Sequence, residues 1–217
     1  MAKNPEAAHK HAHTAAAKRS KRDLLRRLIP RAISKSCNAS IRAGNDSGPR
    51  TKSQIHLVII HCTESPNPGA HGVALFFRSG NPSNGIGSTQ LITDDAGCYR
   101  TLPDLVIPWG APSANTAGVH IEQCGYTAWS RAEWLKHLAT IKRCAYKAAK
   151  ACHAYGIPPV WLSPAQLRAG QHGVSSHANV SLAWPVPGAH TDPGPNYPLD
   201  KFKFWLAEYY KELARGG

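Results

Sequence analysis

Three polar residues in distant parts of this 217-residue chain have the side-chain types that hold a divalent metal ion. His61 follows the apolar run "HLVII", His177 lies in the polar stretch "SSHANVS", and Asp192 lies in "GAHTDPGPNYP". Two imidazoles and one carboxylate are a common three-ligand zinc set, which leaves a fourth position for water. A zinc ion held in this way lowers the pKa of its water to about 7 and polarises a carbonyl group. The residue types therefore point to metal-assisted hydrolysis, although any single histidine among twelve is more often structural.

Strand-like and helix-like segments alternate around these residues and must position them. The apolar run before His61 is typical of a buried strand, whose end is a rigid place to present a ligand. Segment 85–103 is typical of a hairpin with its turn at residues 94–97. Because strands alternate with helices, we expect an α/β (mixed α+β) fold, with a central, mostly mixed sheet flanked by helices. The predicted strands outside the hairpin are 55–63 and 117–125, and the predicted helices are 69–80, 130–156, 163–170 and 199–214.

Positive charge is concentrated near the N-terminus. Residues 1–54 hold 13 Lys and Arg against 3 acids, a balance of +10 within the net charge of +13. We expect residues 1–53 to form a basic, largely disordered leader, with a linker at 36–53, and residues 54–217 to form the catalytic domain. Within the leader, residues 20–35 match a short amphipathic helix, which could bind an anionic surface or pack against the domain. The histidine cluster at residues 9–13 is expected to be a solvated tail.

Six cysteines occur, at positions 37, 62, 98, 124, 144 and 152. They form no C-x-x-C pair, so a cysteine-based zinc knuckle is not expected. Most lie in apolar runs, which favours buried free thiols, while a disulfide stays open at this point.

Four ordered segments resemble one enzyme family. They are the strand ending "VIIHCT", the hairpin "LITDDAGCYRTLP", the stretch "PWGAPSANTAGVHIEQCG", and "HANVSLAWPVPGAHTDPGP". Over residues 54–213 the chain resembles the zinc-dependent N-acetylmuramoyl-L-alanine amidases of the type-2 amidase and peptidoglycan-recognition superfamily, which includes phage endolysins. That family carries a histidine, then a lysine or similar residue, a threonine, and an aspartate or cysteine before Pro-Gly in the last segment. The resemblance implies cleavage of the amide between N-acetylmuramic acid and the L-alanine of the stem peptide.

The resemblance also implies roles for individual residues. His61, His177 and Asp192 would bind Zn²⁺, with His172 as a rival to His177. Glu122 would act as an ionised general base, and His190 would take the position of a catalytic lysine and donate to the oxyanion. Because an imidazole titrates near neutrality, the histidine predicts a falling high-pH limb. The expected substrate-binding residues are Trp109, His120, Thr63 and Asn115.

The chain departs from the family pattern in three places. Residues 181–188 extend the loop before Asp192, Ser88-Thr89-Gln90 replaces a Tyr-His pair, and "PWGAP" replaces "AWHAG". A tyrosine-assisted mechanism is therefore not expected. His120 should point to the same face as Glu122, because side chains alternate along a strand. There it could contact the substrate or support a metal ligand from behind.

The expected partner is bacterial peptidoglycan, and the leader could add an anionic cell-wall polymer or a membrane surface. No nucleic-acid motif accompanies the basic charge, so no nucleic-acid partner is expected. We expect a monomer that is made in a host cytoplasm without a signal peptide, as a phage or prophage lysin, and that acts on the cell wall. The alternative is a non-catalytic peptidoglycan-binding module of the same fold, which the presence of Asp192 and Glu122 argues against.

Overall fold

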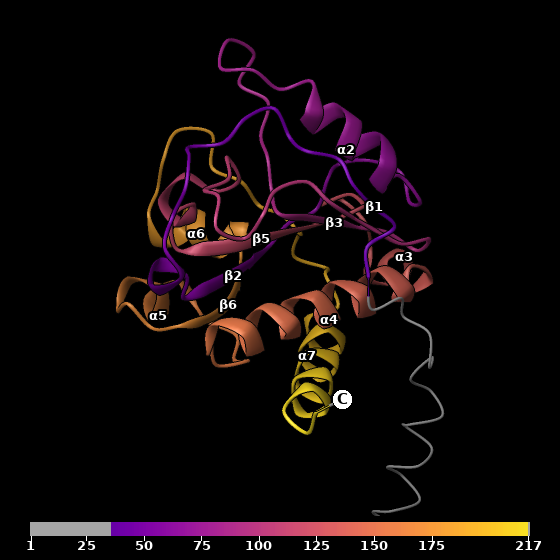
Figure 1. Cartoon of the computed structure of the whole chain (residues 1–217). Coiled ribbons are helices and arrows are strands. Elements are labelled where there is room, and N and C mark those ends of the chain that lie inside the picture. The colour runs from indigo at the N-terminus through magenta and orange to yellow at the C-terminus, as the bar shows by residue number, and fades with distance from the viewer. Residues whose placement is uncertain (1–35, 217) are drawn as a thin grey trace, which may run out of the picture. The chain divides into compact units, whose positions relative to one another are not determined.

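The computed structural model describes residues 36–216, in which one six-stranded sheet separates the helices into two layers (Figure 1). The sheet has the order β1-β4-β3-β5-β2-β6, and all neighbouring strands are parallel except β3 and β4. The expected mixed α/β class and the hairpin are therefore confirmed. The disorder, histidine cluster and amphipathic helix predicted within residues 1–35 lie outside the described residues. The strands are β1 (Ala39–Ser40), β2 (Leu57–Ile60), β3 (Leu91–Thr93), β4 (Cys98–Arg100), β5 (Gly118–Gln123) and β6 (Gly173–Ser176).

The two layers of helices differ in how they approach the sheet. The long helix α4 (Leu138–Tyr155) crosses one face and carries α7 (Leu199–Leu213) on its outer side, whereas α2 (Ala70–Arg78) covers part of the opposite face (Figure 1). Small fully buried residues such as Ala145 and Ala148 let α4 lie close to the strands. No helix among residues 36–216 is long and apolar enough to cross a membrane. The shorter helices are η1 (Lys52–Gln54), η2 (Pro112–Ala114), α3 (Arg131–Lys136), α5 (Pro164–Arg168) and α6 (His177–Ala183).

The single helix predicted over residues 130–156 is interrupted at His137, which separates α3 from α4. Ser130 caps the start as expected, and Gly156 ends α4 in the left-handed conformation. Asp95 explains the break, because its carboxylate accepts from the Thr140 amide at 3.0 Å and contacts the His137 Nδ1 at 2.6 Å. The hairpin turn thus supplies a cap for a second helix start, and no local pattern in 130–156 could reveal it.

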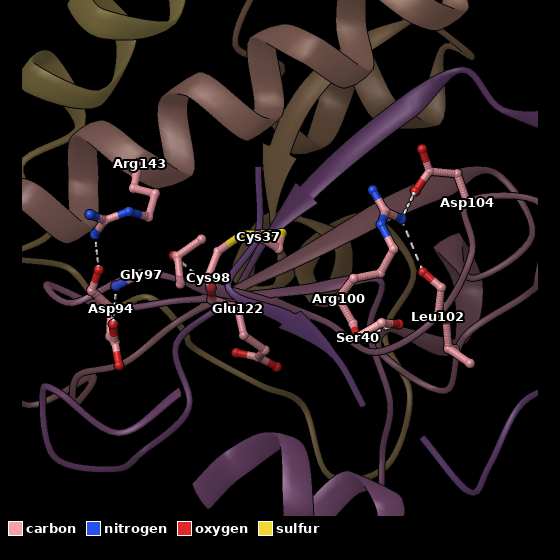
Figure 2. The surroundings of a disulfide bond; sticks show 11 residues. Cys37, Ser40, Asp94, Gly97, Cys98, Arg100, Leu102, Asp104, Glu122 and Arg143 are labelled. Carbon is pink, nitrogen blue, oxygen red and sulfur yellow. Dashed lines mark hydrogen bonds and ion pairs between the residues drawn. A yellow bond between two sulfur atoms is a disulfide. The ribbon is translucent and has the colours of Figure 1, made fainter. Parts of the chain in front are cut away.

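The linker predicted at residues 36–53 is wrong, because this segment packs onto the domain. β1 pairs with β4, and Cys37 forms a disulfide with Cys98, as Figure 2 shows. Buried Arg50 donates to the carbonyls of residues 104, 115, 116 and 118, two of them in the loop that leads into β5 and one at the first residue of β5. The disulfide that the sequence left open is thus formed by this pair. The expectation of buried free thiols is confirmed for the other four cysteines, which form no disulfide.

The disulfide gives a stability prediction. It closes a loop across 61 positions of sequence, which restricts the unfolded chain. The Cys37→Ser/Cys98→Ser double variant should lose about 2–4 kcal/mol of unfolding free energy, measured by urea denaturation. Adding reductant should destabilise the wild type by a similar amount and leave the double variant unchanged. A double variant as stable as the oxidised wild type would contradict this.

Candidate metal centre

The register of the parallel strands brings two of the predicted ligands together. Ile60, the last residue of β2, pairs with Ser176, the last residue of β6. His61 and His177 are the next residues along the two strands, so they leave the same edge of the sheet side by side, with ring centroids 4.7 Å apart. His177 was expected in a polar loop, but it begins α6 directly after β6. The rival ligand His172 lies elsewhere and stacks on His56.

Asp192 completes the group from the turn before α7. Its Oδ2 lies 3.3 Å from the His61 Nδ1, and its Oδ1 lies 3.1 Å from the His177 Nδ1. The Cys62 amide donates to the same carboxylate at 3.3 Å, and the Asp192 carbonyl accepts from Ala178 at 3.0 Å. The turn is thus tied both to the strand that carries one histidine and to the helix that carries the other.

Gly194 makes this turn possible. It has φ +99°, and an added Cβ would lie 2.3 Å from the Thr127 carbonyl oxygen. Gly194→Ala should therefore cost about 1–3 kcal/mol of stability, measured by thermal or urea unfolding. Gly188→Ala is the matched control, since Gly188 also has positive φ but has nothing within 4 Å of its Cβ position. Equal losses in both variants would show that contact with Thr127 is unimportant.

The three side chains fit a divalent cation. All are buried, and their ligand atoms lie within 4.8 Å of one another. The Asp192 Oδ1 is buried and accepts no hydrogen bond, which is costly unless a cation faces it. Burial lowers the pKa of His61, which favours the neutral imidazole that metals bind. Burial alone would raise the pKa of Asp192, but contacts with His177 and His61 outweigh it and hold that pKa well below its usual value.

Glu122 lies opposite His61 on the neighbouring strand. Backbone hydrogen bonds place it there: the His61 amide donates to the Ile121 carbonyl, and the Gln123 amide donates to the His61 carbonyl. Its side chain points away from α4, which carries Arg143 (Figure 2). The Glu122 Oε2 is buried without a hydrogen-bond partner, and burial, followed by the charges of Asp192 and Glu64, raises its pKa well above the usual value. The chain's own groups thus oppose the predicted ionisation, and a cation at the three ligands would favour it.

His190 lies at the edge of the same group. Its ring stacks on His177 with centroids 4.1 Å apart, and its Nδ1 lies 3.6 Å from the Asp192 Oδ1. The side chain is 61% exposed, in contrast to the buried ligands. The His190 amide donates to the Ser181 hydroxyl at 3.1 Å, which ties the residue to α6. His190 can therefore reach a bound molecule beside the three ligands.

A cavity of about 1340 Å³ opens over the three ligands and Glu122. Of the predicted substrate-binding residues, Trp109, Thr63 and Asn115 line it. The Asn115 Oδ1 accepts from the backbone amides of residues 110 and 111, so this oxygen shapes the loop. His120 shares the face of Glu122 as expected, but it is fully buried behind His61 and does not line the cavity.

Sequence reasoning missed several cavity residues. Glu64 has φ +49°, and its carboxylate accepts from the Thr127 amide at 2.7 Å. Ser47 comes from the segment taken for a linker, and it accepts from the Trp109 indole at 2.8 Å. Phe76 projects from α2 and is 57% exposed at the cavity. The apolar run in α2 signalled a helix and gave no sign that Phe76 would stay uncovered.

The sheet has helices on both faces, and at one of its edges two histidines and one carboxylate form a group that could hold a metal ion. The family model described as N-acetylmuramoyl-L-alanine amidase matches residues 51–195, and the chain belongs to that family. Membership supports hydrolysis of an amide in peptidoglycan. No match is found among curated proteins.

Solved structures share the fold. The hydrolase AmiA of Staphylococcus aureus, in complex with its ligand, is 18% identical, with a TM-score of 0.60 over 81% of this chain and 84% of that chain. A mutant endolysin from Bacillus subtilis is 16% identical, with a TM-score of 0.50 over 79% and 99% of the two chains. The N-acetylmuramoyl-L-alanine amidase LysC from Clostridium intestinale is 13% identical, with a TM-score of 0.50 over 79% and 99%. At these identities the likeness concerns the fold.

Proposed function

We propose that this protein is a zinc-dependent amidase that cleaves the bond between N-acetylmuramic acid and the L-alanine of the stem peptide. The observation that carries the proposal is the buried group of His61, His177 and Asp192, whose Asp192 Oδ1 accepts no hydrogen bond, at a large cavity. Two imidazoles and one carboxylate match a catalytic zinc site. Family membership supplies the substrate class.

The chain's own residues divide the remaining work. When bound, zinc would acidify a water molecule and polarise the scissile carbonyl. Glu122, beside the ligands, would take the proton of the attacking water and pass it to the leaving amine. His190, exposed at the edge, would donate a hydrogen bond to the oxygen on which negative charge develops. Trp109 and Thr63 would contact the flanking sugar or peptide.

The role of His190 predicts a change in pH dependence. Burial, then the neighbouring His177, lowers the pKa of His190 below its usual 6.5, so its charged form is lost as pH rises through a value below 6.5. The wild-type kcat/KM should fall across that range. In His190→Lys the limb should move to higher pH, because a lysine stays charged to about pH 10. An unchanged pH profile for the lysine variant would contradict the role.

The proposed activity is tested by digesting purified peptidoglycan with and without a chelator, followed by mass spectrometry. Free stem peptides with an N-terminal L-alanine, lost on chelation and restored by zinc, are the expected result. New reducing sugar ends would instead indicate a glycosidase. Peptidoglycan binding without any product would favour the alternative, a non-catalytic binding module of the same fold.

We further propose a phage or prophage lysin that acts on the cell wall as a monomer, and a targeting role for the basic residues 1–35. The +8 balance of that segment, ten Lys and Arg against Glu6 and Asp23, suits anionic wall polymers or lipids. Deleting residues 1–35 tests this role and keeps Cys37, so the disulfide with Cys98 can still form. Wall binding and lysis that survive the deletion unchanged would contradict it.

A further inference from the structure

A fully buried histidine lies directly behind the ligand His61. His120, on β5, places its Nδ1 2.9 Å from the His61 Nε2, and the two rings stack with centroids 5.1 Å apart. The other ring nitrogen of His120, Nε2, lies 3.3 Å from the Ala114 carbonyl oxygen. His120 therefore bridges a backbone carbonyl and a candidate metal ligand.

The carbonyl sets the direction of both hydrogen bonds. A carbonyl oxygen only accepts, so the His120 Nε2 must carry a hydrogen. A neutral imidazole carries one hydrogen, and His120 is fully buried without a carboxylate partner, so its Nδ1 is an acceptor. The His61 Nε2 must then donate to it. The His61 Nδ1 is left with a lone pair directed at the site, 3.3 Å from the Asp192 Oδ2.

The surrounding backbone holds the His120 ring in this place. A Cβ added to Gly110 would lie 2.6 Å from the ring Nδ1, and one added to Gly118 would lie 2.7 Å from the ring Nε2. Only glycines at these two positions leave room for the ring. The His120 amide also donates to the Gln90 side chain at 2.7 Å, which fixes the backbone of the residue.

We propose that His120 is a positioning residue that locks His61 in the tautomer with a free Nδ1, so that the ring is ready to bind the metal. The proposal rests on the zinc site proposed above. Partners behind metal-binding histidines orient the ring and select its tautomer, and their loss typically costs about 10–100-fold in metal affinity.

The tautomer is measured in the full chain, free of metal, by NMR of ¹⁵N-labelled histidine. The His61 hydrogen is expected on Nε2. Zinc affinity is then measured by competition with a chromogenic chelator. His120→Leu, which removes the acceptor, should weaken zinc binding by about 10–100-fold. His120→Asn should restore most of the affinity, because its Oδ1 takes the place of the ring Nδ1 as acceptor. His172→Leu, which removes a histidine outside the site, is the matched control and should leave the affinity unchanged.

Two results would overturn the proposal: a His61 hydrogen on Nδ1 in the wild type, or unchanged zinc affinity in a folded His120→Leu variant. If that variant fails to fold, Gly110→Ala replaces it, since its Cβ crowds the His120 ring and should also weaken zinc binding. A wild type that binds no zinc would refute the proposed function, and the tautomer measured without metal would still decide the role of His120.

Discussion

Glu122→Gln should lower kcat by about 10²–10⁴-fold, the usual contribution of a general base. The side chain keeps its size, and only its ability to take a proton is lost. Glu122 is 8% exposed and lies beside the three ligands without being one of them, so zinc content should stay at the wild-type level. Steady-state hydrolysis of a muramyl peptide, with metal analysis of the same samples, measures both quantities.

The same substitution should not destabilise the metal-free protein. Burial raises the pKa of Glu122 in the folded state, so ionising this carboxyl at neutral pH costs folding free energy. That cost is absent below the unfolded-state pKa and is fully present above the folded-state pKa. A glutamine avoids it, and the unfolding free energy at pH 7 should equal or exceed that of the wild type. A variant that loses stability along with activity would show that Glu122 acts mainly in folding.

Asp192→Asn should abolish hydrolysis and weaken zinc binding by more than about 100-fold. Losing a residue that only hydrogen-bonds to a metal ligand costs up to about 100-fold in affinity, and losing a ligand itself should cost more. The amide is nearly isosteric, but it removes the negative charge that faces the two imidazoles at 3.1 and 3.3 Å. Equilibrium competition for zinc and the peptidoglycan digestion together measure this effect.

The control for Asp192→Asn is Asp200→Asn, which removes an exposed carboxylate that pairs with Arg131 outside the cavity. It should leave zinc affinity and rate unchanged, because Asp200 does not line the cavity. The loss of its exposed ion pair should cost at most about 1 kcal/mol of stability. Full activity in Asp192→Asn would remove this residue from the metal site. Activity that returns only in excess zinc would support its role as a ligand.

The local sequence determined those parts of the fold that depend on near neighbours. An apolar run placed His61 at the end of a strand, the turn residues 94–97 marked the hairpin, and Ser130 and Gly156 marked helix ends. The resemblance in "HANVSLAWPVPGAHTDPGP" singled out His177 and Asp192. The strand, turn and helix-end predictions succeed because strand period, turn chemistry and capping act over a few residues.

Tertiary structure decided what depends on partners distant in sequence. The four-residue β6 has no pattern of its own, yet its pairing with β2 brings His177 beside His61. Asp95 interrupts a helix 42 residues further along the chain, and Cys98 forms a disulfide with Cys37. His120 turns inward to His61 because glycines leave room for its ring. Sequence alone thus singled out three residues that the structure brings into one group. Their distances, burial and proton positions follow from strand register and packing, which no local pattern encodes.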